Sequence, residues 1–297
     1  MADLIVVGDV MLDVAVSSPP LQRGGDVHGP VQVHPGGAAA NTAVWAGALG
    51  LDVDFYGVLG ADAIGGMLRD EFVRRGVRLP IPRRDASRTG TMLVIHEAGE
   101  RSMVADRGAN ATLRVTDLPE TLEASALYVS GYTLFDRHTE LVALEALRRA
   151  ACEHVAIDAA SWPLIARYTA QRFFEATAGV TILFANAREA EALTGAGPER
   201  AAMLLLEHYA MVVVKQGAEG ATLASRDGFA RRQAPAITEV DPTGAGDAFN
   251  GVFLANLVRG VSPDEALEMA CDAGADVAAS AETWPSFTWG CDAEPKA

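Results

Sequence analysis

The sequence has few of the residues that several common kinds of site require. It contains two lysines, Lys215 and Lys296, and neither follows a glycine. Because a P-loop needs a lysine directly after glycine to hold phosphates, this class of nucleotide site is excluded. The three cysteines, Cys152, Cys271 and Cys291, are widely spaced. They favour reduced thiols over a disulfide framework or a zinc site.

Positive charge and long apolar runs are also scarce. The net charge of −15 leaves no basic footprint, which argues against nucleic acid or an anionic membrane as a partner. No apolar run approaches the ~20 residues that span a membrane. The chain opens directly into the apolar run 4–7, with no basic segment or cleavage site before it, so no export signal is indicated. We therefore expect a cytoplasmic protein without a nucleic-acid or membrane partner.

Short β-rich runs alternate with helical stretches along most of the chain. At 297 residues, 49% of them hydrophobic, the sequence can build one large α/β domain. Alternation of this kind predicts a mostly parallel sheet covered by helices on both faces. The expected strands are residues 4–7, 53–58, 127–129, 154–157, 181–184 and 211–215. The expected helices are residues 41–49, 64–75, 137–151, 188–193, 199–209, 245–258 and 263–279.

Two segments interrupt this alternation. Residues 14–34 carry prolines, paired glycines and short β-like pieces, and residues 91–105 have the pattern of a hairpin with a turn at 97–100. We expect the two to pair into a small projecting β-sheet, formed by about 14–35 and 89–106, which beside an active site would serve as a lid. An edge extension and a dimer surface are the alternatives, and a homodimer would then form through this sheet.

The most informative stretch is a run of small residues between two acids, Asp241-Pro242-Thr243-Gly244-Ala245-Gly246-Asp247. It stands directly before an apolar segment with a helical pattern. Residues without bulk let backbone N–H groups surround an anion, and a helix start adds unpaired donors and the positive end of its dipole. Asp247 can take a proton from a hydroxyl while those donors hold the developing negative charge. The stretch therefore predicts phosphoryl transfer to an alcohol.

A second glycine-rich stretch, from Gly36-Gly37 to Asn41, precedes another expected helix, which Asn41 would cap. Small residues here would let a polyhydroxyl ligand approach the backbone, with Asn41 exchanging hydrogen bonds with its hydroxyls. Tight packing of the helix against the sheet is the alternative explanation for the two glycines. The presence of both stretches in one chain, in this order, favours the ligand site.

These two stretches resemble the signatures of the ribokinase/PfkB family of carbohydrate kinases. The resemblance to this family extends over nearly the whole length of the chain. The residues at the spacing of that family's first signature are Gly36, Gly37, Asn41, Ala43, Gly50 and Gly60, and residues 241–247 match its second. The resemblance implies a ribokinase-like three-layer α/β/α fold with a mostly parallel central sheet and a small projecting β-sheet lid. We expect the kinase domain to span residues 1–283, followed by a weakly ordered tail, residues 284–297.

The resemblance also implies roles for single residues. The catalytic residues would be Asp247 as base and Gly244, Ala245 and Gly246 as anion hole; the sugar would be bound by Asp13, Gly36, Gly37 and Asn41. The nucleotide would be bound by Asn186, Lys215, Gly217, Gly220 and Thr243. Glu189 would organise Mg²⁺ through water, and Asp241 would border a K⁺ site. Without the resemblance, Asn186 and Glu189 would be a helix cap and an exposed acid.

Arg107 is a further candidate for binding the substrate. It stands just before the segment 108–110 and would reach an acidic or phosphorylated substrate. A surface arginine that pairs with Asp106 or another acid is the alternative.

The expected function is ATP- and Mg²⁺-dependent phosphorylation of a hydroxymethyl group on a small sugar or sugar acid, with K⁺ as a candidate further cofactor. A nucleoside kinase of the same fold is the runner-up. Because the lid segments contain no Phe, Tyr or Trp to stack on a base, the sequence favours the simple sugar. The intact Asp247 disfavours a non-catalytic binding protein. A dinucleotide-dependent oxidoreductase is disfavoured because Asp9, not a glycine-rich fingerprint, follows Gly8.

Overall fold

The computed structural model describes residues 2–17, 24–97, 100–280 and 282–285. Within these residues the main body is a nine-stranded sheet in the order β13-β12-β11-β10-β9-β8-β1-β4-β5. The strands from β11 to β5 are parallel, whereas β12 and β13 form an antiparallel edge. The bounds are β1 Ala2–Val7, β4 Val53–Tyr56, β5 Val77–Arg78, β8 Leu122–Ser130, β9 Ala150–Asp158, β10 Ile182–Asn186, β11 Met211–Lys215, β12 Ala221–Ser225 and β13 Gly228–Arg232.

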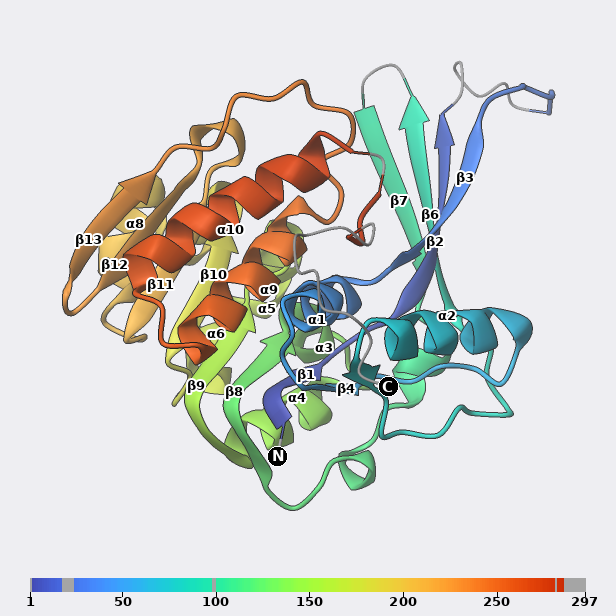
Figure 1. Cartoon of the computed structure of the whole chain (residues 1–297), viewed down its shortest axis with the longest axis horizontal. Coiled ribbons are helices and arrows are strands. Elements are labelled where there is room, and N and C mark those ends of the chain that lie inside the picture. The colour runs from blue at the N-terminus through green and yellow to red at the C-terminus, as the bar shows by residue number, and fades with distance from the viewer. Residues whose placement is uncertain (1, 18–23, 98–99, 281, 286–297) are drawn as a thin grey trace, which may run out of the picture.

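Helices cover both faces of this sheet (Figure 1). In β1, Leu4 and Val6 join the core under one set of helices, and Ile5 and Val7 join the core under the other. The first set is α1 Ala38–Ala48, α2 Ala63–Arg74, α9 Ala245–Val258 and α10 Pro263–Ala278. The second is α3 Gly131–Phe135, α4 Glu140–Arg148, α5 Trp162–Tyr168, α6 Ala170–Ala176, α7 Ala187–Thr194 and α8 Pro198–Leu205. The predicted three-layer α/β/α arrangement is confirmed.

Helix α9 packs against both α1 and α10 (Figure 1). Neighbours surround it, and residues 248–257 are all buried, which explains why apolar residues occur on all of its sides. Its close approach to α1 depends on Gly251, where a Cβ would lie 2.5 Å from the carbonyl oxygen of Thr42. The start of α9 is thereby held beside the first turns of α1.

A second sheet, four-stranded among the described residues, projects from one end of the body (Figure 1). Its order is β3 Val31–Gly36, β2 Met11–Ser17, β6 Gly90–Glu97 and β7 Glu100–Asp106. Strand β2 pairs antiparallel with β3 and parallel with β6, and β6 and β7 form the expected hairpin. The predicted pairing of the two segments is therefore confirmed. Residues 18–23 and 98–99 of these segments lie outside the described residues.

Several local predictions were wrong. Ala150 and Ala151, expected at the end of a helix, begin β9, because they pair in register with β8. Asn41, expected to cap a helix, lies inside α1, whose N-cap is Gly37. The strands β5, β12 and β13 and the helices α3, α5 and α6 were not anticipated. Trp284, expected in a weakly ordered tail, is buried with 5% of its surface exposed, while residues 286–297 lie outside the described residues.

No helix of the described residues is both long enough and apolar enough to cross a bilayer.

Candidate active site

Two cavities lie on either side of the start of α9, beside the carboxyl ends of the parallel strands, where ligands bind in such sheets. The smaller has a volume of about 420 Å³ and is bordered by residues from 234 to 239, α9 and α10. The larger, of about 570 Å³, is bordered by the lid strands β2, β6 and β7. Both are lined by Lys215, Gly217, Pro242, Ala245 and Gly246. The glycine run therefore separates two spaces, as transfer between two ligands requires.

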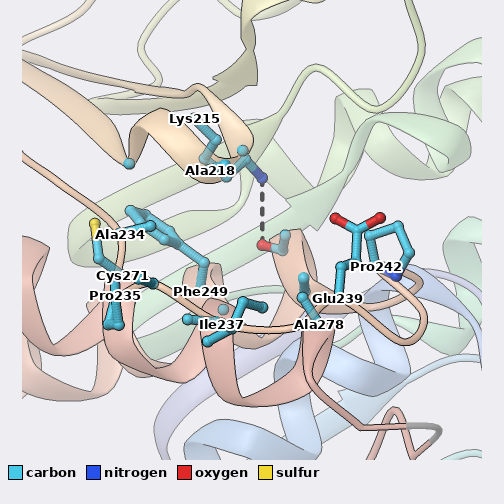
Figure 2. Close-up of a pocket in the computed structure, with 17 residues that line it drawn as sticks. Lys215, Ala218, Ala234, Pro235, Ile237, Glu239, Pro242, Phe249, Cys271 and Ala278 are labelled. Carbon is cyan, nitrogen blue, oxygen red and sulfur yellow. Dashed lines mark hydrogen bonds between the residues drawn. The ribbon is translucent and has the colours of Figure 1, made fainter.

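The smaller cavity has mainly apolar walls (Figure 2). Pro235, Ile237 and Phe249 line it, and Glu239 stands at one side. Apolar walls with a few polar groups suit the flat ring of a nucleotide base.

Asp247, the expected base, lies in the first turn of α9 and lines the larger cavity. Its Oδ2 accepts a hydrogen bond of 2.8 Å from Nδ2 of Asn41. Burial raises the pKa of Asp247 to about 7; the hydrogen bond from Asn41 opposes this rise, and the charge of Asp158 adds to it. A carboxyl group with this pKa gains and loses its proton near neutral pH, which suits a general base.

Backbone donors stand directly beside Asp247. Gly244 is the N-cap of α9 with a φ of 81°, and no described side chain caps the helix. The N–H of Ala245 donates to the carbonyl of Pro242 at 3.2 Å. Within the described part of the chain, the N–H groups of Gly244 and Gly246 have no acceptor. Two of the three expected anion-hole amides are therefore available to an anion, while Ala245 is engaged in the turn.

Asp13, on β2, is the second carboxylate of the larger cavity. Among the described residues its Oδ1 is buried and has no hydrogen-bond partner. Burial, and then the charge of Asp241, raise the pKa of Asp13 to about 7. A buried oxygen without a partner is unfavourable, so a ligand hydroxyl that reached it would be bound strongly.

The two glycines before α1 pack against this part of the protein. A Cβ on Gly36 would overlap the carboxyl group of Asp13. Gly37 has a φ of 97°, and a Cβ there would lie 2.5 Å from the carbonyl oxygen of Asp9. Gly37 lines the larger cavity, together with Asn41. These close contacts require glycine at both positions, and Gly37 also lines the larger cavity, while a role for either glycine in binding the sugar stays a prediction.

Arg107 lines the larger cavity as well, but its guanidinium is already paired. Nε and Nη2 donate to the two oxygens of Asp9 at 2.7 and 2.5 Å. Nη1 lies 2.9 Å from Oδ2 of Asp136 and donates to Oγ1 of Thr139 at 3.1 Å. Its acidic partners are therefore Asp9 and Asp136. Since one cation faces two carboxylates, this group carries a net negative charge and disfavours an acidic ligand.

Asn186 and Glu189 form a capping box at the start of α7. Oδ1 of Asn186 accepts from the N–H of Glu189 at 3.0 Å; the Glu189 carboxylate accepts from the Asn186 N–H at 2.8 Å and from its Nδ2 at 2.6 Å. The expected cap is confirmed, whereas the exposed acid was wrong, since Glu189 is 4% exposed. Burial, and then the charge of Asp158, raise the pKa of Glu189 well above its usual value.

The residues near Glu189 bear on whether Mg²⁺ would fit. Glu189 and Asp158 both line the larger cavity. No three His, Cys, Asp or Glu side chains of the described residues gather closely enough to hold a metal by themselves. Because both Glu189 oxygens already accept from Asn186, Mg²⁺ held through water fits this site better than direct ligation.

Asp158 and Asn250 complete the site and were missed in the sequence. Nζ of Lys215 donates to the carbonyl of Gly246 at 3.2 Å (dashed in Figure 2) and to Oδ1 of Asn250 at 3.0 Å, and lies 3.4 Å from Asp158. Nδ2 of Asn250 donates to Asp158 at 3.2 Å. This network fixes the first turn of α9. The sequence did contain one indication of Asn250, because it stands three residues after Asp247, on nearly the same helix face.

The remaining predicted residues surround the same cavities. Oδ1 of Asp241 accepts from the N–H and the hydroxyl of Thr243 at 2.9 and 2.6 Å, which shapes the turn before α9. Gly217 and Gly220, with φ of 59° and 88°, form the turn after β11. Gly217 lines both cavities and Gly220 the smaller one. The K⁺ site at Asp241 stays a prediction.

Comparison with known proteins decides the family. Residues 1–287 match the profile of the pfkB family carbohydrate kinases. The chain belongs to this family. It is therefore a kinase, a phosphotransferase whose acceptor is an alcohol group.

Relatives of this kinase act on different acceptors. It is 33% identical to the aminoimidazole riboside kinase of Salmonella typhimurium over 78% of this chain and 76% of the relative. It is 30% identical to a fructokinase of Klebsiella pneumoniae over 94% of each. The structure of a putative ribokinase II from E. coli, solved in complex with ATP and Mg²⁺, superposes with a TM-score of 0.82 at 22% identity, covering 95% of this chain and 94% of that one.

Proposed function

We propose that this pfkB family kinase transfers the terminal phosphoryl group of ATP to a hydroxymethyl group of a small neutral sugar. The observation that carries the proposal is the buried Oδ1 of Asp13, unpartnered among the described residues, in the same cavity as Asp247. Asp13 would accept hydrogen bonds from two ring hydroxyls, and this would direct the hydroxymethyl group toward Asp247.

Charge on the cavity wall favours a neutral sugar over a sugar acid. The carboxylates that line the larger cavity include Asp9, Asp13, Asp136, Asp158 and Asp247. Arg107 pairs with two of them and Lys215 with a third, so neither cation is left for a substrate carboxylate. A negatively charged substrate would be repelled here.

The mechanism follows from the positions of these groups. Asp247 takes the proton from the hydroxymethyl oxygen, which attacks the terminal phosphorus atom in line with the leaving oxygen. The N–H groups of Gly244 and Gly246 stabilise the charge that develops on the phosphoryl oxygens. Lys215 holds the peptide carbonyl of Gly246, which keeps those donors in place. Mg²⁺ held through water near Glu189 would neutralise the phosphate charge.

The lid sheet would close the sugar-binding side. Met92 of β6 and Met103 of β7 line the larger cavity and would exclude water from the reaction. The outer strands of this sheet also carry exposed apolar side chains, Val31 and Val33 on β3 and Val104 on β7. They support the homodimer through the lid, which stays a prediction.

A nucleoside kinase is the second candidate, because aromatic side chains line the larger cavity from outside the lid. Tyr132 and Phe135 belong to α3, on the main body. A base attached to ribose could stack on them. The absence of aromatic residues from the lid segments is therefore no longer a reason to prefer a simple sugar. The riboside kinase relative is in line with this candidate.

The test is an ADP-release assay over ribose, fructose, a sugar acid, and one purine and one pyrimidine nucleoside, with the Asp247→Asn protein as blank. The proposal expects the highest kcat/KM on a neutral sugar. A nucleoside with the highest kcat/KM would favour the second candidate. Preference for the sugar acid would contradict the charge argument.

The rate should depend on pH through Asp247. Since this group must be ionised to act as base and its pKa is about 7, kcat/KM should fall at least tenfold for each pH unit well below that value, and more steeply if Asp13, whose pKa is also about 7, must be ionised to bind the sugar. Initial rates at saturating ATP, between roughly pH 5 and 9, would measure the midpoint. A profile that stays flat down to about pH 5 would exclude Asp247 as the base.

Replacing Arg107 with glutamine should affect stability more than substrate choice. Both carboxylates would lose their cation, so the free energy of unfolding should fall by about 3 kcal/mol, measured by urea denaturation. Arg137→Gln, at the exposed position next to Asp136 in the chain, is the control and should change the free energy of unfolding little. An unchanged urea midpoint, with activity lost on acidic substrates alone, would restore Arg107 as a substrate-binding residue.

A further inference from the structure

The segment 282–285, which follows α10, lies across α1 and the start of α9. Thr283 fixes it, because its Oγ1 donates to the carbonyl of Pro35 at 3.0 Å and its own carbonyl accepts from Nε1 of Trp45 at 3.0 Å. Thr283 also packs on the glycine run, since a Cβ on Gly244 would lie 3.2 Å from the Cβ of Thr283. The segment thus contacts the anion hole directly.

The next residue, Trp284, reaches the base through one intermediate side chain. Its ring packs edge-on against Phe72, with centroids 5.3 Å apart, and the guanidinium of Arg75 lies 5.1 Å from it. Its Nε1 donates to Oδ1 of Asn41 at 2.7 Å. Nδ2 of the same amide donates to Oδ2 of Asp247 at 2.8 Å. Trp284, Asn41 and Asp247 therefore form an unbroken hydrogen-bonded chain.

Donor chemistry gives this chain a fixed direction. An indole N–H can only donate, so it must face the oxygen of the Asn41 amide, and the amide nitrogen must then face Asp247. If the amide were turned over, its oxygen would face the ionised carboxylate and both hydrogen bonds would be lost. The nitrogen stabilises the ionised form of the base, whereas the oxygen would stabilise the protonated form.

We propose that Trp284 is a positioning residue for the reaction: it holds the Asn41 amide in the orientation that keeps Asp247 ready to accept the substrate's proton. The effect of Trp284 on the reaction rate rests on the function proposed above, whereas the hydrogen-bonded chain from Trp284 to Asp247 does not depend on that function. Trp284 lines neither cavity and would act only through Asn41.

Loss of the indole N–H should raise the pKa of Asp247, because Asn41 would no longer be held with its nitrogen toward the carboxylate. We expect a rise of about one unit, the size that loss of one hydrogen bond to a carboxylate gives. Four further titratable groups face Asp247 and stay unchanged by this loss: Asp13 of β2, Tyr128 of β8, Asp158 of β9 and Lys215 of β11.

The first test uses the unaltered protein with isotope-labelled tryptophan. The indole N–H resonance of Trp284 should shift with pH around the Asp247 midpoint of about 7, and Asp247→Asn should abolish the shift. The indole of Trp45 donates to Thr283 instead of Asn41, so its resonance is the internal control and should lack that midpoint. A Trp284 resonance that ignores the ionisation of Asp247 would overturn the proposal.

The second test is kinetic. Trp284→Phe keeps an aromatic ring against Phe72 and removes the N–H. On the best substrate of the panel, kcat/KM should fall about fivefold at pH 7 and return to the wild-type value above about pH 9. Trp45→Phe removes an indole hydrogen bond to the same segment and should leave the pH midpoint unchanged. An equal loss at every pH for Trp284→Phe would mean a merely structural role and overturn the proposal.

The two tests separate failure of this inference from failure of the proposed function. A titrating Trp284 resonance in a protein that phosphorylates no member of the panel would support the positioning chain and contradict the function. If the protein phosphorylates a member of the panel but its Trp284 resonance does not titrate, the function would be supported and the positioning chain contradicted. If Trp284→Phe does not fold, the resonance experiment on the unaltered chain and Asp247→Asn decides alone.

Discussion

Replacing Asp247 with asparagine should lower kcat by about a hundredfold to ten-thousandfold while ATP binding stays near the wild-type value. Asparagine has nearly the size of aspartate but cannot take the proton from the hydroxymethyl group. Its amide oxygen can still accept the hydrogen bond from Asn41, so the first turn of α9 keeps its contacts. The measurements are kcat from ADP release and the ATP dissociation constant from calorimetry.

The same substitution should stabilise the fold, which separates lost chemistry from damaged structure. Burial raises the pKa of Asp247 from 3.8 to about 7, so ionisation favours the unfolded chain increasingly as pH rises between these values. The variant should therefore melt higher than the wild type, and by more at about pH 8 than at about pH 5. Asp276→Asn, on an exposed part of α10, is the control for loss of one charge. A variant that keeps its kcat would exclude Asp247 as the base.

The residues that made the reaction predictable are neighbours in the chain. Gly244, Gly246 and Asp247 belong to one turn at the start of a helix. The free N–H groups of such a turn lie beside the carboxylate whatever the rest of the fold, so the local sequence is enough to predict them. The capping box of Asn186 and Glu189 is local in the same way. The alternating strands and helices were predictable too, because each is encoded by its own hydrophobic period.

The parts that could not be predicted depend on residues far apart in the chain. Arg107 and its partner Asp9 are separated by 98 positions, and Trp284 and Asn41 by 243. Only the folded sheet brings such side chains together. For the same reason Ala150 and Ala151 were assigned to a helix: their small side chains fit one, and pairing with β8 overrides that preference. Composition alone likewise gave no sign that Arg107 would be neutralised by two acids.

Replacing Asp13 with asparagine should raise KM for the sugar by about 10- to 100-fold, with a smaller effect on kcat. Oδ1 of Asp13, without a partner among the described residues, is the acceptor that we assign to the sugar hydroxyls, and a carboxylate accepts hydrogen bonds more strongly than an amide. The charge of Asp13 also raises the pKa of Asp247, so the midpoint of the pH profile should move down in the variant. Steady-state kinetics over sugar concentration at several pH values measure both effects.

Asp13→Glu separates the charge of this residue from its position. Glutamate keeps the negative charge, so the pH midpoint should stay near the wild-type value of about 7. Its extra methylene group must fit where even a Cβ on Gly36 would overlap the Asp13 carboxyl group, so the glutamate carboxylate should be displaced and KM should rise as in the asparagine variant. Overpacking should also lower the melting temperature, whereas asparagine, which removes a buried charge, should raise it. An unchanged KM in both variants would show that the sugar does not bind at Asp13, and the larger cavity would then need another acceptor for its hydroxyls.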